Sequence, residues 1–443
     1  MRKYLRFLGL AVLVVLTCAG IWLCMVYCEG EDPEIVLSKN IKMIGQRTTF
    51  DITCNDRKSG IRSISVDIVQ DGEKDTLESL NLPARGTMQE TLTIDLLPED
   101  LKLHDGNATI EISVIDFSLR KNTRTVTFGV VIDTIPPQIS PVSTYHYINP
   151  GGACVVAYTL SEDVSRSGVQ VDNDFFPSYP TDSGSVVSRT SYFAIPTIDA
   201  AKKHLKIQIL AEDNAGNIAL FPVSFHVKSK KFRADRMNIS QRFLEIKVPE
   251  FQHRYKALAG TTLVKAFSYI NTQIRLQDKE TIEAICRNTR PEKLWEGAFL
   301  RMQNAATMAT FGDRRTYYHN GEVISKSVHM GVDLASTRNA RVVASNAGVI
   351  AFTGRIGIYG NTVIIDHGMG ILSLYGHLSS ISTRKDQVVK KGEEIGRTGL
   401  TGMAGGDHLH FSMIVGGKFV NPVEWWDPHW IQDNITRKLS GEG

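Results

Sequence analysis

Short runs of alternating apolar and polar residues dominate positions 33–228 of the chain. Apolar side chains recur at every second position in the runs 61–68, 108–114 and 205–210, and turn-forming residues separate these runs. Because successive side chains of a β-strand point to opposite faces, a period of two predicts strands that bury one face. This segment is therefore expected to form β-sheets.

The strand-rich segment also repeats itself. Asp56 with Ser59-Gly60-Ile61 is echoed by Asp163 with Ser167-Gly168-Val169. An interval of roughly 100 residues is the size of an immunoglobulin-like sandwich, and the pattern resembles the tandem immunoglobulin-like modules of bacterial surface proteins. Pro136-Pro137 marks the joint, because consecutive prolines cannot donate to a sheet ladder. Two modules are predicted, at 33–134 and 135–228.

The pattern changes to helical spacing after a basic joint at 228–233. A first helix is predicted behind the N-cap Thr261-Thr262, with apolar positions 263, 267, 270 and 274 on one face. A second helix is predicted to start at Asp278 or Thr281, and Pro291 is expected to open a third segment that carries Leu294, Trp295, Phe299 and Met302. Residues 229–313 are therefore expected to form a helical linker subdomain.

The C-terminal part returns to short strands that are separated by glycine-rich turns, which suit tight antiparallel connections. The predicted strands are 342–345, 348–352, 361–366, 371–375 and 409–415. An antiparallel β-domain is predicted at 314–428, followed by a C-terminal tail at 429–443. The fold class is thus mainly β: two sandwiches, a helical linker and a C-terminal β-domain.

The N-terminus carries Arg2, Lys3 and Arg6 before an uncharged apolar run from Phe7 to Cys28. A run of roughly 20 apolar residues predicts a membrane-crossing helix, and the basic residues orient its start toward the cytoplasm. A single-pass transmembrane anchor is therefore expected at 1–28, with every later domain exported. A cleaved signal peptide is the alternative.

The net charge of the chain excludes few classes of function. The chain has 443 residues, which predicts two to four domains, and a formal net charge of +3. No basic cluster with interleaved aromatic residues stands out in the sequence. No nucleic-acid partner is therefore expected.

Two clusters of metal-binding residue types frame the C-terminal domain. His329, Gly331 and Asp333 alternate near its start, and His408 and His410 near its end. If both clusters lie on strands, each would present its side chains on one face. Two histidines and one carboxylate fill three positions of a tetrahedral zinc ion and leave the fourth to water, which is the pattern of a catalytic site.

The ordered motifs resemble the full signature of the lysostaphin-type (LytM-like) zinc metallopeptidases over roughly residues 317–426. They are His329-x-Gly-x-Asp333, Asp366-His-Gly368, Tyr375-Gly-His-Leu378, the glycine series 392, 396, 399 and 402, and His408-x-His410-Phe411. Two departures are Gly406-Asp407 before the paired histidines, and Ser412 where glutamate is common.

The resemblance implies one zinc ion on His329, Asp333 and His410. It implies His377 and His408 as the catalytic pair, one accepting a proton and the other donating; the order stays open. Tyr375 and Asn361 are predicted substrate-binding residues, although Tyr375 in a strand can equally serve packing and Asn361 a turn.

The implied function is hydrolysis of peptide cross-links in bacterial peptidoglycan, as a D,D-endopeptidase. With the predicted anchor, this implies single-pass insertion in a bacterial inner membrane and the later domains in the periplasm. The alternative is a non-catalytic LytM-like regulator that activates a cell-wall amidase; retention of both catalytic histidines and all three ligands favours the enzyme. The immunoglobulin-like modules are expected to act as a spacer or to bind the wall or an envelope protein partner. The helical linker is expected to pack on the sandwich or to cover the groove, which would make the enzyme latent.

Overall fold

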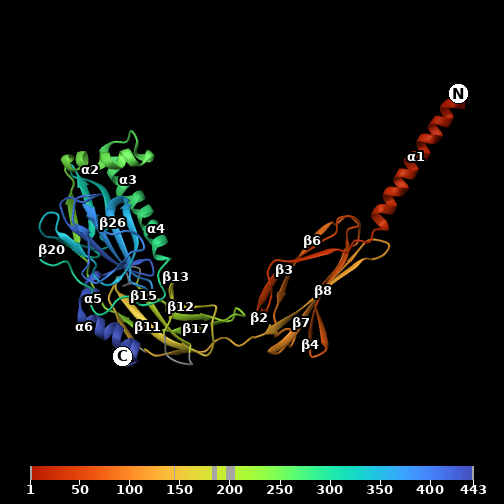
Figure 1. Ribbon diagram of the computed structural model, residues 1–443, viewed down its shortest axis with the longest axis horizontal. Helices are drawn as coiled ribbons and strands as arrows, with labels where there is room; N and C mark the ends of the chain where they lie inside the picture. Colours follow the sequence, from red (N-terminus) through yellow and green to blue (C-terminus); the bar gives the residue numbers. More distant parts are fainter. Residues whose placement is uncertain (1, 144, 182–186, 196–204, 442–443) are drawn as a thin grey trace. The chain divides into compact units, whose positions relative to one another are not determined.

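The computed structural model describes residues 2–143, 145–181, 187–195 and 205–441, without the side chains of 2–6 and 23–27. The chain divides into two compact units (Figure 1). The first comprises 1–137 and 212–219, and the second comprises 138–211 and 220–443. The second unit contains every residue of the predicted zinc site.

The first unit holds two sheets around one apolar core. In β7 every second residue is buried from Ala108 to Asp116, which confirms the period-two prediction. The three-stranded sheet has the order β1 (Glu34–Leu37), β3 (Thr48–Asn55), β6 (Gln89–Leu96). The five-stranded sheet has the order β2 (Met43–Ile44), β8 (Thr123–Ile132), β7 (Gly106–Asp116), β4 (Ile61–Gln70), β5 (Glu73–Asn81).

The predicted inner-membrane anchor is wrong. Helix α1 runs Arg2–Tyr27, but within the part of the chain that the structure describes, no helix is long and apolar enough to cross a membrane. The predicted localisation as a single-pass inner-membrane protein is therefore wrong as well.

The second unit begins with a further group of strands. One four-stranded sheet has the order β14 (Tyr179–Pro180), β15 (Val187–Ala194), β11 (Ala153–Leu160), β9 (Ile139–Pro141). The other has the order β13 (Asp174–Pro177), β12 (Arg166–Val171), β16 (Ile207–Glu212), β17 (Ile218–Pro222). A parallel pair joins β10 (Tyr145–Ile148) to β18 (Ser224–Val227).

A helical segment follows, as predicted. The Thr262 side chain caps α3 (Leu263–Tyr269) by accepting from the Lys265 N–H. The next helix starts earlier than expected, because the π-helical segment η2 (Ile270–Ile274) continues directly into α4 (Arg275–Cys286). The other elements are β19 (Ala234–Asn238), α2 (Gln241–Arg254) and η1 (Lys256–Leu258). Strand β19 pairs in parallel with β21 (Arg314–His319), and β21 pairs with β22 (Glu322–Val328).

The third segment, which Pro291 is expected to open, is not helical. Residues 287–305 contain no helix, and their backbone instead bonds to other segments. The N–H groups of Leu294, Phe299 and Leu300 donate to the carbonyls of His367, Trp425 and Ser345 at 2.9, 2.8 and 2.7 Å. These backbone N–H groups bond to carbonyls of distant segments and not to carbonyls within a helix. The apolar side chains of this stretch therefore pack from an extended chain.

The C-terminal β-domain is built on an antiparallel sheet, and each of the five predicted strands is present. The sheet order is β20 (Ala306–Ala309), β23 (Val332–Ala335), β31 (Leu409–Val415), β27 (Ile371–Leu378), β26 (Gly360–Asp366), β25 (Gly348–Ile356), β29 (Val388–Val389), with β32 (Lys418–Val420) on β31. A second sheet has the order β24 (Arg341–Val343), β30 (Glu394–Arg397), β28 (Ser380–Ile381).

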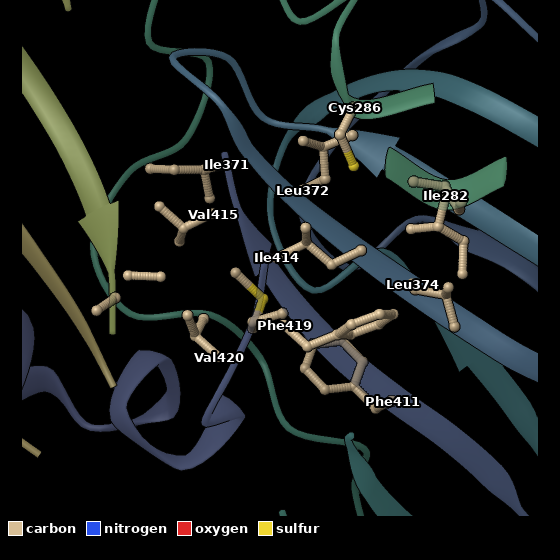
Figure 2. Packing of buried hydrophobic residues seen from close by; sticks show 14 of the residues in the cluster. Ile282, Cys286, Ile371, Leu372, Leu374, Phe411, Ile414, Val415, Phe419 and Val420 are labelled. Carbon is tan, nitrogen blue, oxygen red and sulfur yellow. The ribbon is translucent and has the colours of Figure 1, made fainter. Parts of the chain in front are cut away.

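The helical segment and this domain share one core. Ile282 and Cys286 of α4 lie against Leu372, Leu374 and Ile414 of the central strands (Figure 2). All five side chains are buried. Burial of each such side chain contributes about 1.5–3 kcal/mol. Helix α4 is therefore part of the folded β-domain and not a loose linker.

The predicted tail is also folded. It forms α6 (Pro428–Ile431), η4 (Gln432–Thr436) and α7 (Arg437–Ser440), and Ile431 and Ile435 are buried. Just before it, Glu424 of α5 (Pro422–Trp426) accepts from Asn149 Nδ2 at 2.7 Å and from the Ala153 N–H at 3.0 Å. The C-terminal helices thus fasten the β-domain to the strands that precede it.

Candidate metal centre

Strand pairing brings the two predicted metal-binding clusters together. Strands β23 and β31 pair so that Asp333 lies opposite His410. His329 and Gly331 lie in the turn between β22 and β23, so the expectation that they share a strand with Asp333 is wrong. The turn nevertheless directs the His329 side chain to the same point.

Three potential ligand atoms converge there. His329 Nε2 and His410 Nδ1 each lie 2.9 Å from Asp333 Oδ1, and 3.1 Å from each other. The three residues form a group that could hold a metal ion. All three side chains are almost entirely shielded from solvent, with 5%, 6% and 13% exposure for His329, His410 and Asp333.

His329 and His410 each make a hydrogen bond on the side of the ring that faces away from Asp333. These bonds show which ring nitrogens carry protons, and this decides whether a cation fits between the three residues. His329 Nδ1 lies 3.0 Å from the Thr310 carbonyl, which can only accept, so Nδ1 carries the proton. Ser412 Oγ donates to the Met330 carbonyl at 2.9 Å and therefore accepts from His410 Nε2 at 3.0 Å. The nitrogens that point inward, His329 Nε2 and His410 Nδ1, thus carry lone pairs, and these face a carboxylate oxygen of Asp333. Three converging acceptors suit a cation, and this donor set suits zinc.

Two backbone features support the site. A Cβ on Gly331 would lie 2.6 Å from His410 Nε2 and 2.6 Å from Ser412 Oγ, so only glycine leaves room for this histidine. The turn that carries Thr310 is held by Asp313, whose fully buried carboxylate accepts from the Thr310 N–H at 2.8 Å and from its hydroxyl at 2.7 Å. Asp313 therefore positions the carbonyl that orients His329.

The predicted catalytic histidines lie beside the cluster. The rings of His377 and His408 are 4.8 Å apart between centroids. Their Nδ1 atoms lie 2.8 Å from the carbonyls of Thr401 and Gly406, so each Nε2 is free to exchange a proton. His408 Nε2 is 3.6 Å from Asp333 Oδ1.

The two imidazoles differ in environment. Burial, reinforced by the neighbouring His408 and His410, holds the pKa of His377 well below its usual value. Burial opposes protonation of His408 as well, but the hydrogen bond and charge of Asp333 outweigh it and raise the pKa of His408. His377 also adopts a φ of 63°, a left-handed conformation that costs a residue with a Cβ about 1–2 kcal/mol. Such strain concentrates at functional sites.

The predicted substrate-binding residues lie elsewhere. Tyr375 is 1% exposed, and its hydroxyl accepts from the Ser345 N–H at 2.8 Å and from Ser373 Oγ at 3.0 Å. The backbone N–H of Asn361 donates to Thr401 Oγ1 at 2.9 Å. Neither residue is among those that line the cavity at the metal-binding cluster; Tyr375 is buried in β27, and Asn361 lies in strand β26.

The cavity has a second wall that sequence motifs did not reveal. About 550 Å³ of space lies against His329, Asp333, His377, His408 and His410. Its remaining lining includes the helical-segment residues Ser240, Phe243, Phe267, Asn271 and Arg275, together with Arg315 of β21 and Tyr359 of η3 (Gly357–Tyr359). The helical segment therefore borders the candidate site, as one of its two predicted placements requires.

Arg315 is the nearest charged neighbour of the cluster. One of its guanidinium nitrogens donates to Asp333 Oδ2 at 3.1 Å, so the carboxylate binds the guanidinium through one oxygen and faces the histidines through the other. Tyr359 lies nearby, with its ring tilted 57° to that of His410 and the two centroids 5.3 Å apart. Neither residue belongs to a recognisable motif, because both reach the site through tertiary packing.

Residues 327–422 match the model of Peptidase family M23. This M23 segment lies inside the predicted β-domain and contains all three candidate ligands and both predicted catalytic histidines. The DD-carboxypeptidase/endopeptidase Mpg of Neisseria meningitidis serogroup B is 46% identical over 96 residues, which cover 22% of each chain. The peptidoglycan DD-endopeptidase ShyA of Vibrio cholerae is 40% identical over 96 residues, again 22% of each chain.

A protein that is named for a different role is also similar. The murein hydrolase activator NlpD of Escherichia coli (strain K12) is 33% identical over 102 residues, which cover 23% of this chain and 27% of that one. This chain therefore spans less than a third of each of these relatives. The likeness concerns the M23 segment alone.

Proposed function

We propose that this protein is a zinc-dependent endopeptidase that hydrolyses peptide cross-links of bacterial peptidoglycan, with D,D-endopeptidase specificity. The observation that carries the proposal is the convergence of His329 Nε2, His410 Nδ1 and Asp333 Oδ1, with both imidazole protons directed away from the centre. Mpg and ShyA, which are similar to the M23 segment, bear endopeptidase names and support the choice of substrate.

His329, Asp333 and His410 would hold one zinc ion. When bound, zinc polarises a carbonyl and lowers the pKa of water, which are two requirements of amide hydrolysis. The chain's own contribution is proton transfer: with Nδ1 of His377 and His408 engaged by carbonyls, each Nε2 can accept a proton or, once protonated, donate one. One histidine would accept the proton of the attacking water, and the other would stabilise the developing negative charge.

The second candidate is a non-catalytic activator of a cell-wall hydrolase, which similarity to NlpD favours. The presence of all three ligands and both proton-transferring histidines at one point argues for the enzyme. The test is digestion of purified peptidoglycan, with and without a chelator, followed by mass analysis of the released fragments. Chelator-sensitive loss of cross-linked dimers is expected. Zinc-loaded protein that releases nothing, but stimulates an amidase, would establish the activator instead.

We further propose that the helical segment restricts access to the site. Phe243 of its α2 helix and the N-cap residue Ser240 belong to the cavity lining. Outside the cavity, α2 is fastened by Lys247 Nζ, which donates to the Leu400 carbonyl at 2.5 Å, and by the ion pair of Glu250 with Arg355. Loss of these contacts would free α2 and widen the opening for large substrates.

The strands before the helical segment are proposed to form immunoglobulin-like modules that act as a spacer or bind an envelope protein. The packing of two sheets around one core in the first unit supports this assignment. A partner captured by the full chain, and lost when 33–137 is deleted, would identify a binding role. Capture of the same partners by both forms would favour the spacer.

A further inference from the structure

Two arginines face the cavity from its non-catalytic wall. Arg275 belongs to α4 of the helical segment, and Arg315 belongs to β21. In both side chains the Nε atom is buried, and it has no hydrogen-bond partner among the described residues. Because both side chains line the cavity, their guanidinium groups can donate to an acceptor that arrives with a ligand.

Both guanidiniums are already anchored at one end. Arg275 donates to Asn271 Oδ1 at 2.8 Å, and Asn271 is itself fixed by donation to Ser325 Oγ at 2.7 Å. Arg315 donates to Asp333 Oδ2 at 3.1 Å. Each anchor uses a terminal nitrogen and leaves Nε unused. The two side chains are therefore pre-oriented, which lowers the entropic cost of binding a ligand.

With zinc bound, the charge balance of the cavity would favour an anion. Its lining contains two carboxylates, of which Asp333 faces the histidines and Arg315, while Asp407 accepts from Thr398 Oγ1 at 2.5 Å and from the Asn339 N–H at 3.2 Å. A zinc ion on the histidine cluster would add two positive charges. The cavity would then carry an excess of positive charge beside a set of planar donors, and arginine forks match the geometry of carboxylates.

We propose that Arg275 and Arg315 bind a carboxylate of the substrate next to the cleaved peptide bond. This inference rests on the proposed function, because cross-linked stem peptides carry such groups at the C-terminal D-alanine and at the diamino acid of the cross-link. Recognition of one of them would place the bond against His377 and His408. Arg275 is a substrate-binding residue in this scheme, whereas Arg315 also positions Asp333.

The test uses the full chain, loaded with zinc, and three forms of one cross-linked peptide: unmodified, amidated at the C-terminal carboxylate, and amidated at the diamino acid carboxylate. Binding is measured by calorimetry and turnover by mass spectrometry. One amidated form is expected to bind roughly tenfold to a hundredfold more weakly and to show a raised KM, because a charge-assisted pair is lost. Which form loses affinity identifies the carboxylate.

The variant Arg275→Gln is expected to weaken binding of the unmodified peptide by the same factor and to leave binding of the sensitive amidated form unchanged. Arg275→Lys should restore part of the loss. Arg287→Gln, an exposed position at the end of the same helix, is the matched control and should behave like the parent. Equal losses for all three peptides, or no binding of any, would overturn the carboxylate site.

The two proposals fail in different ways. If the unmodified peptide binds selectively through Arg275 but is never cleaved, the endopeptidase assignment fails and the carboxylate site stands. If all three peptides are cleaved with the same KM, the enzyme assignment stands and the carboxylate site fails.

Discussion

Arg315 and Asp333 form an ion pair at 3.1 Å, and through it a residue outside every recognisable motif contacts a predicted metal ligand. The guanidinium takes Oδ2 of the carboxylate, while Oδ1 faces His329 and His410. Both partners are largely shielded from solvent, with 17% and 13% side-chain exposure. The pair therefore fixes the rotation of the carboxylate that presents Oδ1 to the metal.

Replacement of Arg315 by glutamine is expected to weaken zinc binding roughly tenfold to a hundredfold, as loss of residues that orient metal ligands commonly does. Zinc affinity is measured by competition with a chromophoric chelator. Arg315→Lys should recover part of the affinity. Lys326→Gln, on the solvent side of the paired strand β22, is the control and should match the parent. Unchanged affinity in Arg315→Gln would refute the positioning role.

Replacement of His377 by asparagine separates chemistry from metal binding. Asparagine tolerates the left-handed backbone at this position, so the fold should persist. We expect kcat to fall by about 10²–10⁴ because proton transfer is lost, with bound zinc unchanged by mass spectrometry. His429→Asn, at a position with 96% exposure, is the control. Retained turnover in His377→Asn would remove this residue from the catalytic pair.

Glu424 predicts a pH dependence of stability. Burial raises its pKa from 4.5 to about 7, against the opposing effect of donation from Asn149 and Ala153. Because the folded-state pKa is the higher one, this group's stability contribution is full below pH 4.5 and is lost as the pH rises toward 7. The shift corresponds to roughly 3 kcal/mol.

We therefore expect Glu424→Gln to unfold at higher urea than the parent at pH 8, and the difference to vanish near pH 4.5. Glutamine can accept from the Ala153 N–H and donate to a rotated Asn149 amide. Glu322→Gln, an exposed replacement, controls for the general effect of removing a carboxylate. A difference between Glu424→Gln and the parent that stays constant from pH 4.5 to 8 would contradict this assignment.

Release of α2 tests the access hypothesis. The double replacement Lys247→Gln with Glu250→Gln removes the charges that fasten α2 to Leu400 and Arg355. Turnover of intact peptidoglycan should rise, while turnover of a small soluble cross-linked peptide should stay the same, because only the large substrate needs a wider opening. Glu245→Gln, whose side chain contacts Gln241 within the same helix, is the control. If the double replacement changes the turnover of both substrates by the same factor, α2 has no gating role.

The sequence by itself predicted the candidate ligand set, through motif order and the family resemblance that it carries, and the strands that hold most of these residues. Asp333, His377 and His410 lie on β23, β27 and β31, of which β27 and β31 are buried along their whole length, so motif order and not periodicity predicted that they act together. Local periodicity failed where distant partners decided the conformation. Residues 291–302 have helical spacing, but their backbone N–H groups bond to strands and turns far along the chain.

Tertiary structure alone decided the surroundings of the site. The carbonyls of Thr310 and Thr401 set the protonated nitrogens of His329 and His377, and a backbone carbonyl leaves no mark in a sequence. Arg275 and Arg315 reach the cavity only because α4 packs on the central strands and β21 lies beside them. The physical reason is the same throughout: ligand chemistry resides in side-chain types, whereas orientation, access and charge balance arise from contacts between segments far apart in the chain.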